Sequence, residues 1–445
     1  MLVRIRKFLA SDIFLILMAV IAAVIICVDQ MLGTPVYYGL SIYFGFLCFF
    51  VLALSDDMLS MLGPALLMLS FVIQYKNSFD AYMEYLWGIP VLVICVILHI
   101  VLGHKSFVGL KISSLALFKP ICFTSVALFL GGVGSLSLGE YFSTLSVVYM
   151  ILLGPAVLLL YWYFSSRFAN SSSFSFYRLA KIMVVVSCFL IFAIFEYYGE
   201  HWAKFIASPN VLPFQWRNNA CTLLMIAMPF GFYLSKEKSL WYFLVPVMTC
   251  VAFVLSGSRG GLLFGLLEFL ILVIYYSVVD SRHRWVYLSV LGIGLALGVV
   301  VLIKYSSLVS YTLSRFTSSK ENFRRIGLWK RSVSDFLSNP VTGRGIGYMG
   351  NRDFHPSQVG QLCWYHSSIP QVIGSMGIVG ILAYGYQLVC RFKVLRGLGS
   401  AGACALMSIL GLELMSLVNP GIFTPAYLII ITVVMACAER ASSNN

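Results

Sequence analysis

Residues 13–28 read IFLILMAVIAAVIICV, a run without a single charged residue between Asp12 and Asp29. Apolar runs of roughly 17–25 residues, each long enough to cross a hydrocarbon core of about 30 Å, recur along the whole chain. The 445 residues are 60% hydrophobic and 11% charged, whereas a soluble domain carries about 25% charged residues. The composition therefore excludes a soluble protein and predicts an all-α polytopic membrane protein.

The apolar runs predict about fourteen transmembrane helices, and a misread pair of runs would reduce this number to about twelve. The predicted helices start near Ile13, Val36, Met58, Leu86, Lys119, Leu145, Leu179, Asn219, Leu240, Gly261, Trp285, Ile369, Ala401 and Phe423. No small-residue cleavage site follows the first run, so we interpret it as a span and not as a signal peptide. Nearly all cysteines lie inside the runs, and no Cys/His spacing indicates a zinc site.

The short loops alternate between basic and nearly neutral, which predicts the orientation of the spans. With the basic N-terminus in the cytoplasm, every second loop carries lysine or arginine, as cytoplasmic loops do. Both termini are then cytoplasmic and the number of spans is even. We divide the chain into a transmembrane bundle of about eleven spans (1–303), an extracytoplasmic loop (304–368), and C-terminal spans with a cytoplasmic tail (369–445).

The predicted extracytoplasmic loop is basic, on the side of the membrane where positive charge is usually scarce. Its nine basic and three acidic residues give an excess of about six positive charges. The charged residues are Lys304, Arg315, Lys320, Arg324, Arg325, Lys330, Arg331, Arg344 and Arg352, with Glu321, Asp335 and Asp353. This excess indicates an anionic partner, and the alternative is a solvated loop that touches lipid headgroups.

Apolar residues recur at helical spacing inside this loop, at Ile326, Trp329, Val333, Phe336 and Leu337. They predict an amphipathic helix that ends before Asn339-Pro340 and packs on the membrane surface or on the bundle. Arg325 lies one turn before Trp329 on the same side of this helix. The stretch GRGIGYMG that follows, residues 343–350, has no preceding strand and lacks the Lys-Ser/Thr of a P-loop, so we interpret its glycines as a tight turn.

Two arginines stand at the outer ends of other predicted spans. SGSRGG, residues 256–261, places Arg259 between two spans, and an arginine beside the hydrocarbon core is costly and usually functional. WRNN, residues 216–219, places Arg217 just before another span. Either arginine binds an anionic ligand or extends to the lipid headgroups.

Two histidines are candidates for chemistry on the same face. LCWYHSSIPQ, residues 362–371, places His366 at the outer end of a predicted span, where a histidine is either a catalyst or an interfacial polar residue. His355 is its rival, but it precedes Pro356 in what we interpret as a loop turn. An unperturbed imidazole has a pKa near 6.5, so much of it is neutral and able to accept a proton at pH 7.

The predicted topology gathers Arg259, Arg325 and His366 on one side of the membrane. The outer loops contain no paired carboxylates close in sequence that would suggest a metal site. Arginines together with one histidine suit a diphosphate leaving group and a hydroxyl nucleophile, without a metal.

Four elements resemble, in order and spacing, the O-antigen ligase and polymerase family. They are SGSRGG at 256–261, RIGLW at 325–329, FLSNPVTGRGIGY at 336–348 and YHSSIPQVIGSMGIVGILAY at 365–384. Family members typically have an SRGG-like element, an arginine shortly before a tryptophan, a Pro-x-x-Gly-x-Gly turn, and a histidine that opens a glycine-rich span. The resemblance covers about a third of the chain. Many members have an asparagine after the histidine, where this chain has Ser367.

This resemblance implies a metal-independent, inverting membrane glycosyltransferase of the GT-C type, without a cofactor, in the inner (cytoplasmic) membrane. It would transfer a glycan from a polyprenyl (undecaprenyl) diphosphate to a glycan or lipid-linked acceptor on the outer face. Arg259, Arg325 and Arg217 would bind the donor diphosphate, and His366 would orient or deprotonate the acceptor hydroxyl. Membrane lipid, a flippase and a chain-length regulator would be its partners, and nucleic acid would not.

Three functions remain open at this stage. We favour a polysaccharide polymerase, because the external loop is compact and shows no second feature suited to a large anionic acceptor. An O-antigen ligase acting on a lipid A core or another envelope acceptor is the first alternative. A flippase or transporter for lipid-linked oligosaccharides is the second, since Glu413 is an intramembrane charge that could serve a proton relay.

Overall fold

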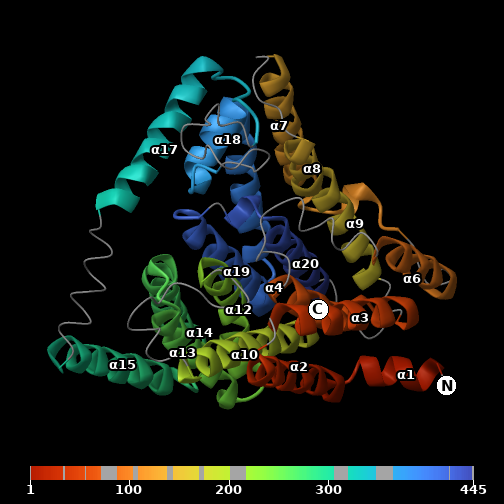
Figure 1. The fold of residues 1–445 in the computed structure, drawn as a ribbon, viewed down its shortest axis with the longest axis vertical. Coiled ribbons are helices and arrows are strands. Elements are labelled where there is room, and N and C mark those ends of the chain that lie inside the picture. Colours follow the sequence, from red (N-terminus) through yellow and green to blue (C-terminus); the bar gives the residue numbers. More distant parts are fainter. Residues whose placement is uncertain are drawn as a thin grey trace.

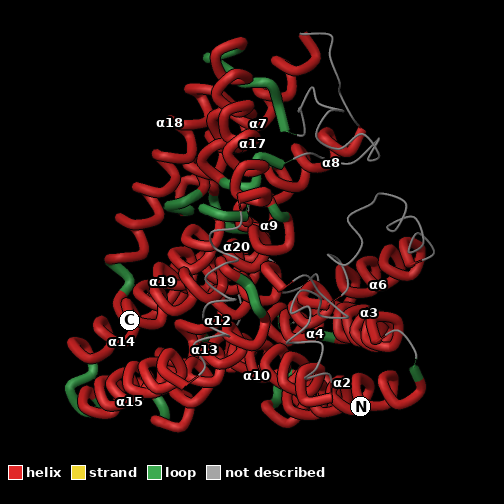
Figure 2. The backbone as a smooth tube through the Cα atoms, turned by 60° about the vertical axis from the view of Figure 1, so that its left-hand side comes forward, coloured by secondary structure: helices red, strands yellow, loops and turns green. Residues whose placement is uncertain are grey.

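The described part of the protein is built of helices and loops. The computed structural model describes residues 2–33, 36–55, 57–71, 88–103, 109–137, 144–169, 175–200, 217–304, 319–346, 364–419 and 421–442. Figure 2 shows helices joined by loops and no strand in these residues. The all-α class predicted from the apolar runs is therefore confirmed for the described residues.

The helices follow the predicted runs, and each predicted start has a helix that begins at it or within a few residues of it. In chain order the elements are α1 (Leu2–Leu9), α2 (Asp12–Leu32), α3 (Val36–Leu54), α4 (Met58–Phe71), α6 (Gly88–Gly103), η2 (Ile112–Ser114), α7 (Phe118–Ser137), α8 (Thr144–Leu153), α9 (Pro155–Ala169), α10 (Phe176–Glu200), α12 (Arg217–Glu237), η3 (Leu240–Phe243), α13 (Leu244–Ser256), η4 (Gly261–Gly265), α14 (Leu266–Val279), α15 (Arg284–Lys304), α17 (Ser319–Ser338), α18 (Ser368–Arg396), α19 (Gly399–Ser416), η5 (Gly421–Phe423) and α20 (Pro425–Ser442).

Not every one of these helices is long enough to cross a bilayer by itself. Among the described residues, 6 helices are long and apolar enough to do so: Asp12–Leu32, Ser146–Ala169, Phe176–Gly199, Gly261–Val279, Ser368–Arg396 and Gly399–Ser416. Shorter apolar helices of 10–17 residues accompany them, among them those in α3, α6 and α15. These helices agree with a polytopic membrane protein, while a total of about fourteen spans stays a prediction.

The helices form connected groups around a central bundle (Figure 1). At one end α18 lies between α17 and α7 and packs against both. At the centre α12 packs against α10, α13 and α19, and α20 packs against α9 and α19. The α2, α3 and α15 helices lie toward the opposite end of the molecule. Several α15 side chains are exposed, including Ile293, Leu295 and Leu297, as expected of a helix in contact with hydrocarbon.

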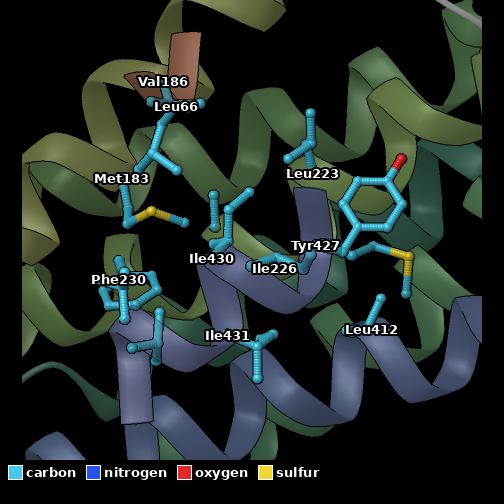
Figure 3. Close-up of a cluster of buried hydrophobic side chains, with 14 of the residues drawn as sticks. Leu66, Met183, Val186, Leu223, Ile226, Phe230, Leu412, Tyr427, Ile430 and Ile431 are labelled. Carbon is cyan, nitrogen blue, oxygen red and sulfur yellow. The ribbon is translucent and has the colours of Figure 1, made fainter. Parts of the chain in front are cut away.

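The hydrophobic core centres on α12, because this helix is apolar on all sides. Every residue from Ala220 to Phe232 is buried, which is typical of a helix enclosed by other helices. Figure 3 shows α12 side chains meeting residues of α4, α10, α19 and α20. The residues that it labels include Leu66, Met183, Phe230, Leu412 and Ile430. This core fixes α12, which begins at the predicted site residue Arg217, and α19 beside it.

Candidate functional site

Arg217 and Arg259 are held at neighbouring helix ends. Arg217 is the first residue of α12, and its Nη1 donates a hydrogen bond to the carbonyl oxygen of Gly257 at 3.1 Å. In the adjacent position, Ser258 Oγ donates to Asn218 Oδ1 at 2.7 Å. Gly257 ends α13, and the half-buried Arg259 follows two residues later. The structure thus brings two arginines that are 42 residues apart in sequence to one end of the bundle.

The glycines of SGSRGG let this turn pack closely against two helices. An added Cβ on Gly261 would lie 2.5 Å from Cys221 Sγ of α12, and one on Gly260 would lie 2.9 Å from Met415 Sδ of α19. Ser258 Oγ accepts a hydrogen bond from the Gly261 N–H at 3.0 Å, as an N-cap residue does. Arg259 therefore lies in the first turn of a capped helix that is fixed between α12 and α19.

Arg325 lies on α17, and the structure confirms the helix predicted there, including its end before Asn339-Pro340. Four of the five predicted apolar residues are on the exposed side of this helix, namely Ile326 (44%), Trp329 (39%), Val333 (50%) and Leu337 (70%), whereas Phe336 is half-buried. Leu328, Ser332 and Asp335 form the buried side, and α17 packs against α18. Arg325 precedes Leu328 by three residues and shares that side. Of the two packing modes left open by the sequence, the structure shows packing on the bundle, through Leu328 and two polar residues and not through most of the predicted apolar residues.

The loop after α17 inserts into an opening in α18. Gly377 interrupts α18 with φ 59° and ψ −151°. Backbone hydrogen bonds fill the opening, from Arg344 N to Gly374 O (2.9 Å), Gly345 N to Ser375 O (2.9 Å), Ile378 N to Pro340 O (2.9 Å) and Val379 N to Val341 O (3.1 Å). Gly343 and Gly345 have positive φ, and a Cβ on Gly343 would overlap the backbone of Met376. The interpretation of these glycines as a tight turn is confirmed, while residues 347–350 lie outside the described residues.

His366 directly precedes α18 in an unusual backbone conformation. In the part of the chain that the structure describes, it is the only non-glycine residue with positive φ, at 55°. This left-handed region costs an ordinary residue roughly 1–2 kcal/mol. Ser367 is extended and forms the N-cap of α18, and its carbonyl accepts a hydrogen bond from Gln371 N at 3.1 Å. The half-buried His366 thus lies at the helix end where the sequence predicted it.

Sequence reasoning missed a buried polar network beside this histidine. Tyr365 is 0% exposed, and its hydroxyl donates to Asp335 Oδ2 of α17 at 2.6 Å. The backbone N–H of Tyr365 donates to Gln371 Oε1 at 3.1 Å, and Gln371 Nε2 donates to Ser375 Oγ at 2.8 Å. Asp335 Oδ1 also pairs with Arg331 Nε at 3.2 Å. The i,i+4 spacing of Arg331 and Asp335 was the signal in the sequence that could have drawn attention to this carboxylate.

The charge state of Asp335 is set by opposing effects. Burial raises the pKa of its carboxyl group, because the charged form loses hydration. The hydrogen bond from Tyr365 and the positive charges of Arg331 and Arg344 act in the opposite direction, but the pKa remains above its usual range. The network therefore depends on a carboxyl group that is harder to ionise than an exposed one.

The connection between α19 and α20 joins the two parts of the site. The ring of Trp364, two residues before the candidate histidine, lies 6.4 Å from the ring of Phe423 in η5. At the start of α20, Tyr427 Oη donates to the carbonyl oxygen of Asn219, in the first turn of α12, at 3.3 Å. One short segment thus contacts both the stretch that carries the histidine and the helix end that carries the first arginine.

The structure therefore brings the predicted site residues together in two separate pairs. Arg217 and Arg259 share one helix junction, whereas Arg325 and His366 are connected through the packing of α17 on α18. His355, the rival histidine, lies outside the described residues. Within the described ranges, no group of three or more His, Cys, Asp or Glu residues is arranged to hold a metal ion. Independence from metal stays a prediction.

The intramembrane charge that suggested a relay has a partner. Glu413 of α19 lies 3.6 Å from Arg391 of α18, so the buried arginine and the half-buried glutamate form an ion pair between neighbouring helices. A second buried carboxyl group, Glu268 of α14, was not singled out from the sequence. It packs so closely against α19 that a Cβ on Gly411 would lie 2.6 Å from its Oε1. The ion pair thus links α19 to α18, whereas Glu268 is closely packed against α19 without a hydrogen bond to its carboxyl oxygens in the described residues.

The comparisons with known proteins single out one region of the chain. No curated protein matches the sequence. A family model described as O-Antigen ligase matches residues 244–385, from the first residue of α13 into α18. The matched region contains Arg259, Arg325 and His366, and it begins after Arg217. The resemblance carried by the four motifs is thereby confirmed for residues 244–385, which contain all four motifs and are similar to the O-antigen ligase family.

Proposed function

We propose that the protein is a membrane glycosyltransferase that transfers a glycan from a polyprenyl diphosphate to an acceptor hydroxyl on the outer face of the cytoplasmic membrane. The observation that carries this proposal is the family match, because the matched region holds two arginines and the histidine that the chemistry requires. The structure supports it by connecting both parts of the site through η5 and α20.

In this proposal the arginines bind the donor diphosphate. Arg259 lies in the first turn of a helix, where the helix dipole also favours an anion. Guanidinium groups form bidentate, charge-assisted hydrogen bonds to phosphate, and Arg325 adds a second such group from α17. Arg217 lies at the same junction as Arg259 and completes the set. Their positive charge stabilises the diphosphate as it leaves.

His366 acts on the acceptor in the same reaction. The acceptor oxygen forms a bond to the anomeric carbon while the bond from that carbon to the phosphate oxygen breaks. The electron pair leaves with the polyprenyl diphosphate, and the hydroxyl proton passes to the imidazole of His366. Attack from the side opposite the leaving group inverts the anomeric configuration. Such a general base contributes about 10²–10⁴-fold to the rate.

The acceptor distinguishes the polymerase, which we favour, from the ligase. A polymerase joins the donor glycan to another lipid-linked repeat and produces a ladder of polymers, whereas a ligase joins it to a lipid A core or other finished acceptor. A flippase would need a relay across the membrane. The ion pair of Arg391 and Glu413 offers a structural reason for the charge that suggested one.

The test is to incubate the purified protein with a synthetic polyprenyl-diphosphate glycan and each acceptor, in the presence of a metal chelator. We expect glycan transfer with stoichiometric release of polyprenyl diphosphate and, for a polymerase, products of increasing length. Movement of the donor across vesicle membranes without release of polyprenyl diphosphate would contradict the proposal in favour of a flippase. Loss of transfer on chelation would contradict the metal-independent mechanism.

The side of the membrane is tested separately by cysteine labelling of intact cells. A cysteine at Ser357 in the proposed outer loop should react with an impermeant maleimide, whereas one at Lys238 should not. Lys238 is suitable because it is exposed in the loop after α12, whereas the nearby Ser235 is fully buried. Labelling at Lys238 but not at Ser357 would reverse the orientation and place the site in the cytoplasm.

A further inference from the structure

The backbone at His366 is held in its left-handed conformation from both sides. The preceding residue, Tyr365, is fully buried, and the following residue, Ser367, is the N-cap of α18. His366 is the single residue that joins these two fixed points. Because its backbone would otherwise relax to a negative φ, the conformation persists only while both neighbours stay in place.

Tyr365 is anchored at three points on two helices, α17 and α18. Its hydroxyl donates to Asp335 of α17, and its backbone N–H donates to Gln371, one turn inside α18. Its ring packs so closely on Gly374 that a Cβ there would lie 2.9 Å from a ring carbon. Gln371 is itself held by Ser375, at the opening of α18. Of these anchors, the hydrogen bond to Asp335 is the one that reaches α17.

We propose that Asp335 and Tyr365 are positioning residues that hold the imidazole of His366 toward the acceptor hydroxyl. This inference rests on the proposed function, in which His366 receives the hydroxyl proton. A phenol–carboxylate hydrogen bond buried on the packed side of α17 fixes Tyr365, and Tyr365 fixes the direction of the next residue. The same bond couples α17, which carries Arg325, to the residue before His366. The hydrogen bond thereby fixes the position of α17, the proposed donor-binding helix, relative to His366, the proposed general base.

Three substitutions separate the hydrogen bond from the packing. Tyr365→Phe keeps the ring against Gly374 but removes the hydroxyl, and Asp335→Leu removes the acceptor. Asp335→Asn keeps an oxygen that can accept from the phenol. We expect Tyr365→Phe and Asp335→Leu to lower kcat about 10- to 100-fold with an unchanged KM for the donor, because small displacements of a catalytic group have effects of this size. Asp335→Asn should retain most of the native kcat.

Leu328→Ala is the matched control. Leu328 lies on the same buried side of α17, so its loss weakens the packing on α18 without touching the hydrogen bond to Tyr365. It should leave kcat near the native value. The double variant Tyr365→Phe/Asp335→Leu should be no slower than either single variant, because both remove one interaction.

A readout independent of activity keeps this inference distinguishable from the proposed function. The rate at which diethyl pyrocarbonate modifies His366, followed by mass spectrometry, should change in Tyr365→Phe and Asp335→Leu but not in Asp335→Asn or Leu328→Ala. Native kcat and a native modification rate in Tyr365→Phe would overturn the inference, and so would an Asp335→Asn variant as impaired as Asp335→Leu. Near-native transfer by His366→Ala would instead refute the proposed function, while the modification rates would still report on the positioning.

Discussion

The arginine end and the histidine end of the candidate site are built in different ways. At the arginine end, hydrogen bonds from Arg217 and Ser258 join α12 to the turn before the helix that starts at Arg259. Residues Gly261–Gly265 (η4) of that helix form a π-helical turn, which is flanked by residues with ordinary helical backbone angles. At the histidine end, α18 is opened at Gly377, a loop fills the opening through its backbone, and His366 adopts a left-handed conformation. The arginine end is therefore built from helix termini, whereas the histidine end depends on backbone in the left-handed region.

This difference matches what each end has to do in the proposed reaction. A diphosphate is a diffuse charge that is bound by any well-placed guanidinium groups and N–H donors, so helix ends suffice. A general base must direct one nitrogen at one proton, which demands a fixed direction. Strain at a single residue is a common feature of sites that need such a fixed direction. The comparison therefore predicts which substitutions affect chemistry and which affect binding.

The sharpest test of the comparison is the loss of the imidazole. His366→Ala should abolish glycan transfer, a decrease of about 10²–10⁴-fold, because the acceptor hydroxyl is a poor nucleophile without a base. Donor binding should persist, since the arginine end is unchanged. Transfer and donor affinity are measured with the purified variant and a synthetic polyprenyl-diphosphate donor. His355→Ala, the control at the rival histidine, should remain substantially active, and near-native transfer by His366→Ala would refute the assignment.

Substitution of either proposed donor-binding arginine, Arg259 at the arginine end or Arg325 on α17, should affect the donor. Charge-assisted contacts to phosphate contribute roughly 1.5–3 kcal/mol each, and lysine cannot reproduce the bidentate geometry of arginine. Arg259→Lys and Arg325→Lys should therefore lose about 10- to 100-fold in turnover while the protein still inserts in the membrane. Turnover and donor affinity are measured in parallel for both variants. If both retain native turnover, diphosphate binding by these residues is wrong.

Arg217 sharpens this second test because it precedes the matched region. Its guanidinium already donates to the carbonyl oxygen of Gly257, so part of its role is to hold the turn that carries Arg259. Arg217→Lys should accordingly impair turnover less than Arg259→Lys does. A loss of turnover confined to Arg217→Lys would place the diphosphate at Arg217, at the start of α12, and not at Arg259.

The two ends should also differ in their tolerance of added side-chain volume. Gly343→Ala at the histidine end combines a positive φ with overlap on backbone atoms of Met376, so we expect a cost of about 2–4 kcal/mol. Gly260→Ala at the arginine end meets side-chain atoms of Met415 and Val418 and no backbone, in a helical conformation that favours alanine over glycine, and we expect about 1 kcal/mol or less.

Gly399→Ala isolates the conformational part of this difference. Gly399 has φ 62°, but an added Cβ meets no atom within 4 Å, so only the backbone cost of about 1–2 kcal/mol applies. Apparent melting temperatures of the detergent-solubilised variants should rank Gly343→Ala lowest, Gly399→Ala next and Gly260→Ala nearest to native. A melting temperature of Gly343→Ala equal to that of Gly399→Ala would mean that the opening in α18 adapts to the extra methyl group.

The sequence predicted the helix starts well because they depend on local patterns. Apolar runs fix where helices begin, and the six residues SGSRGG already place Arg259 between two predicted spans. The helix over α17 was predicted from spacing that is also local. Which side of α17 packs was not settled, because in a membrane protein an apolar stripe can face lipid while a polar side packs inward.

The histidine end was only partly predictable because it depends on contacts between distant residues. Residues 368–396 read as one uninterrupted apolar helix, and nothing local announces the opening that the loop after α17 fills. Asp335 and Tyr365 are 30 residues apart, so their hydrogen bond exists only in the folded chain. The left-handed conformation of His366 follows from that tertiary arrangement, which the sequence indicates only through the position of His366 before a helix.

The smallest effect that we predict is a pH dependence of the local stability of α17 at the histidine end. Burial raises the pKa of Asp335 above its unfolded value, so between those two pKa values the folded protein binds more protons than the unfolded one. The contribution of this group to stability is therefore complete below the unfolded pKa and is lost as pH rises through the folded pKa.

Hydrogen exchange of α17, corrected for intrinsic rates, should show stronger protection at mildly acidic than at neutral pH. Asp335→Asn should remove this dependence, because the amide does not titrate, whereas the arginine end should be unaffected. An equal pH dependence in native and Asp335→Asn proteins would mean that another group controls α17.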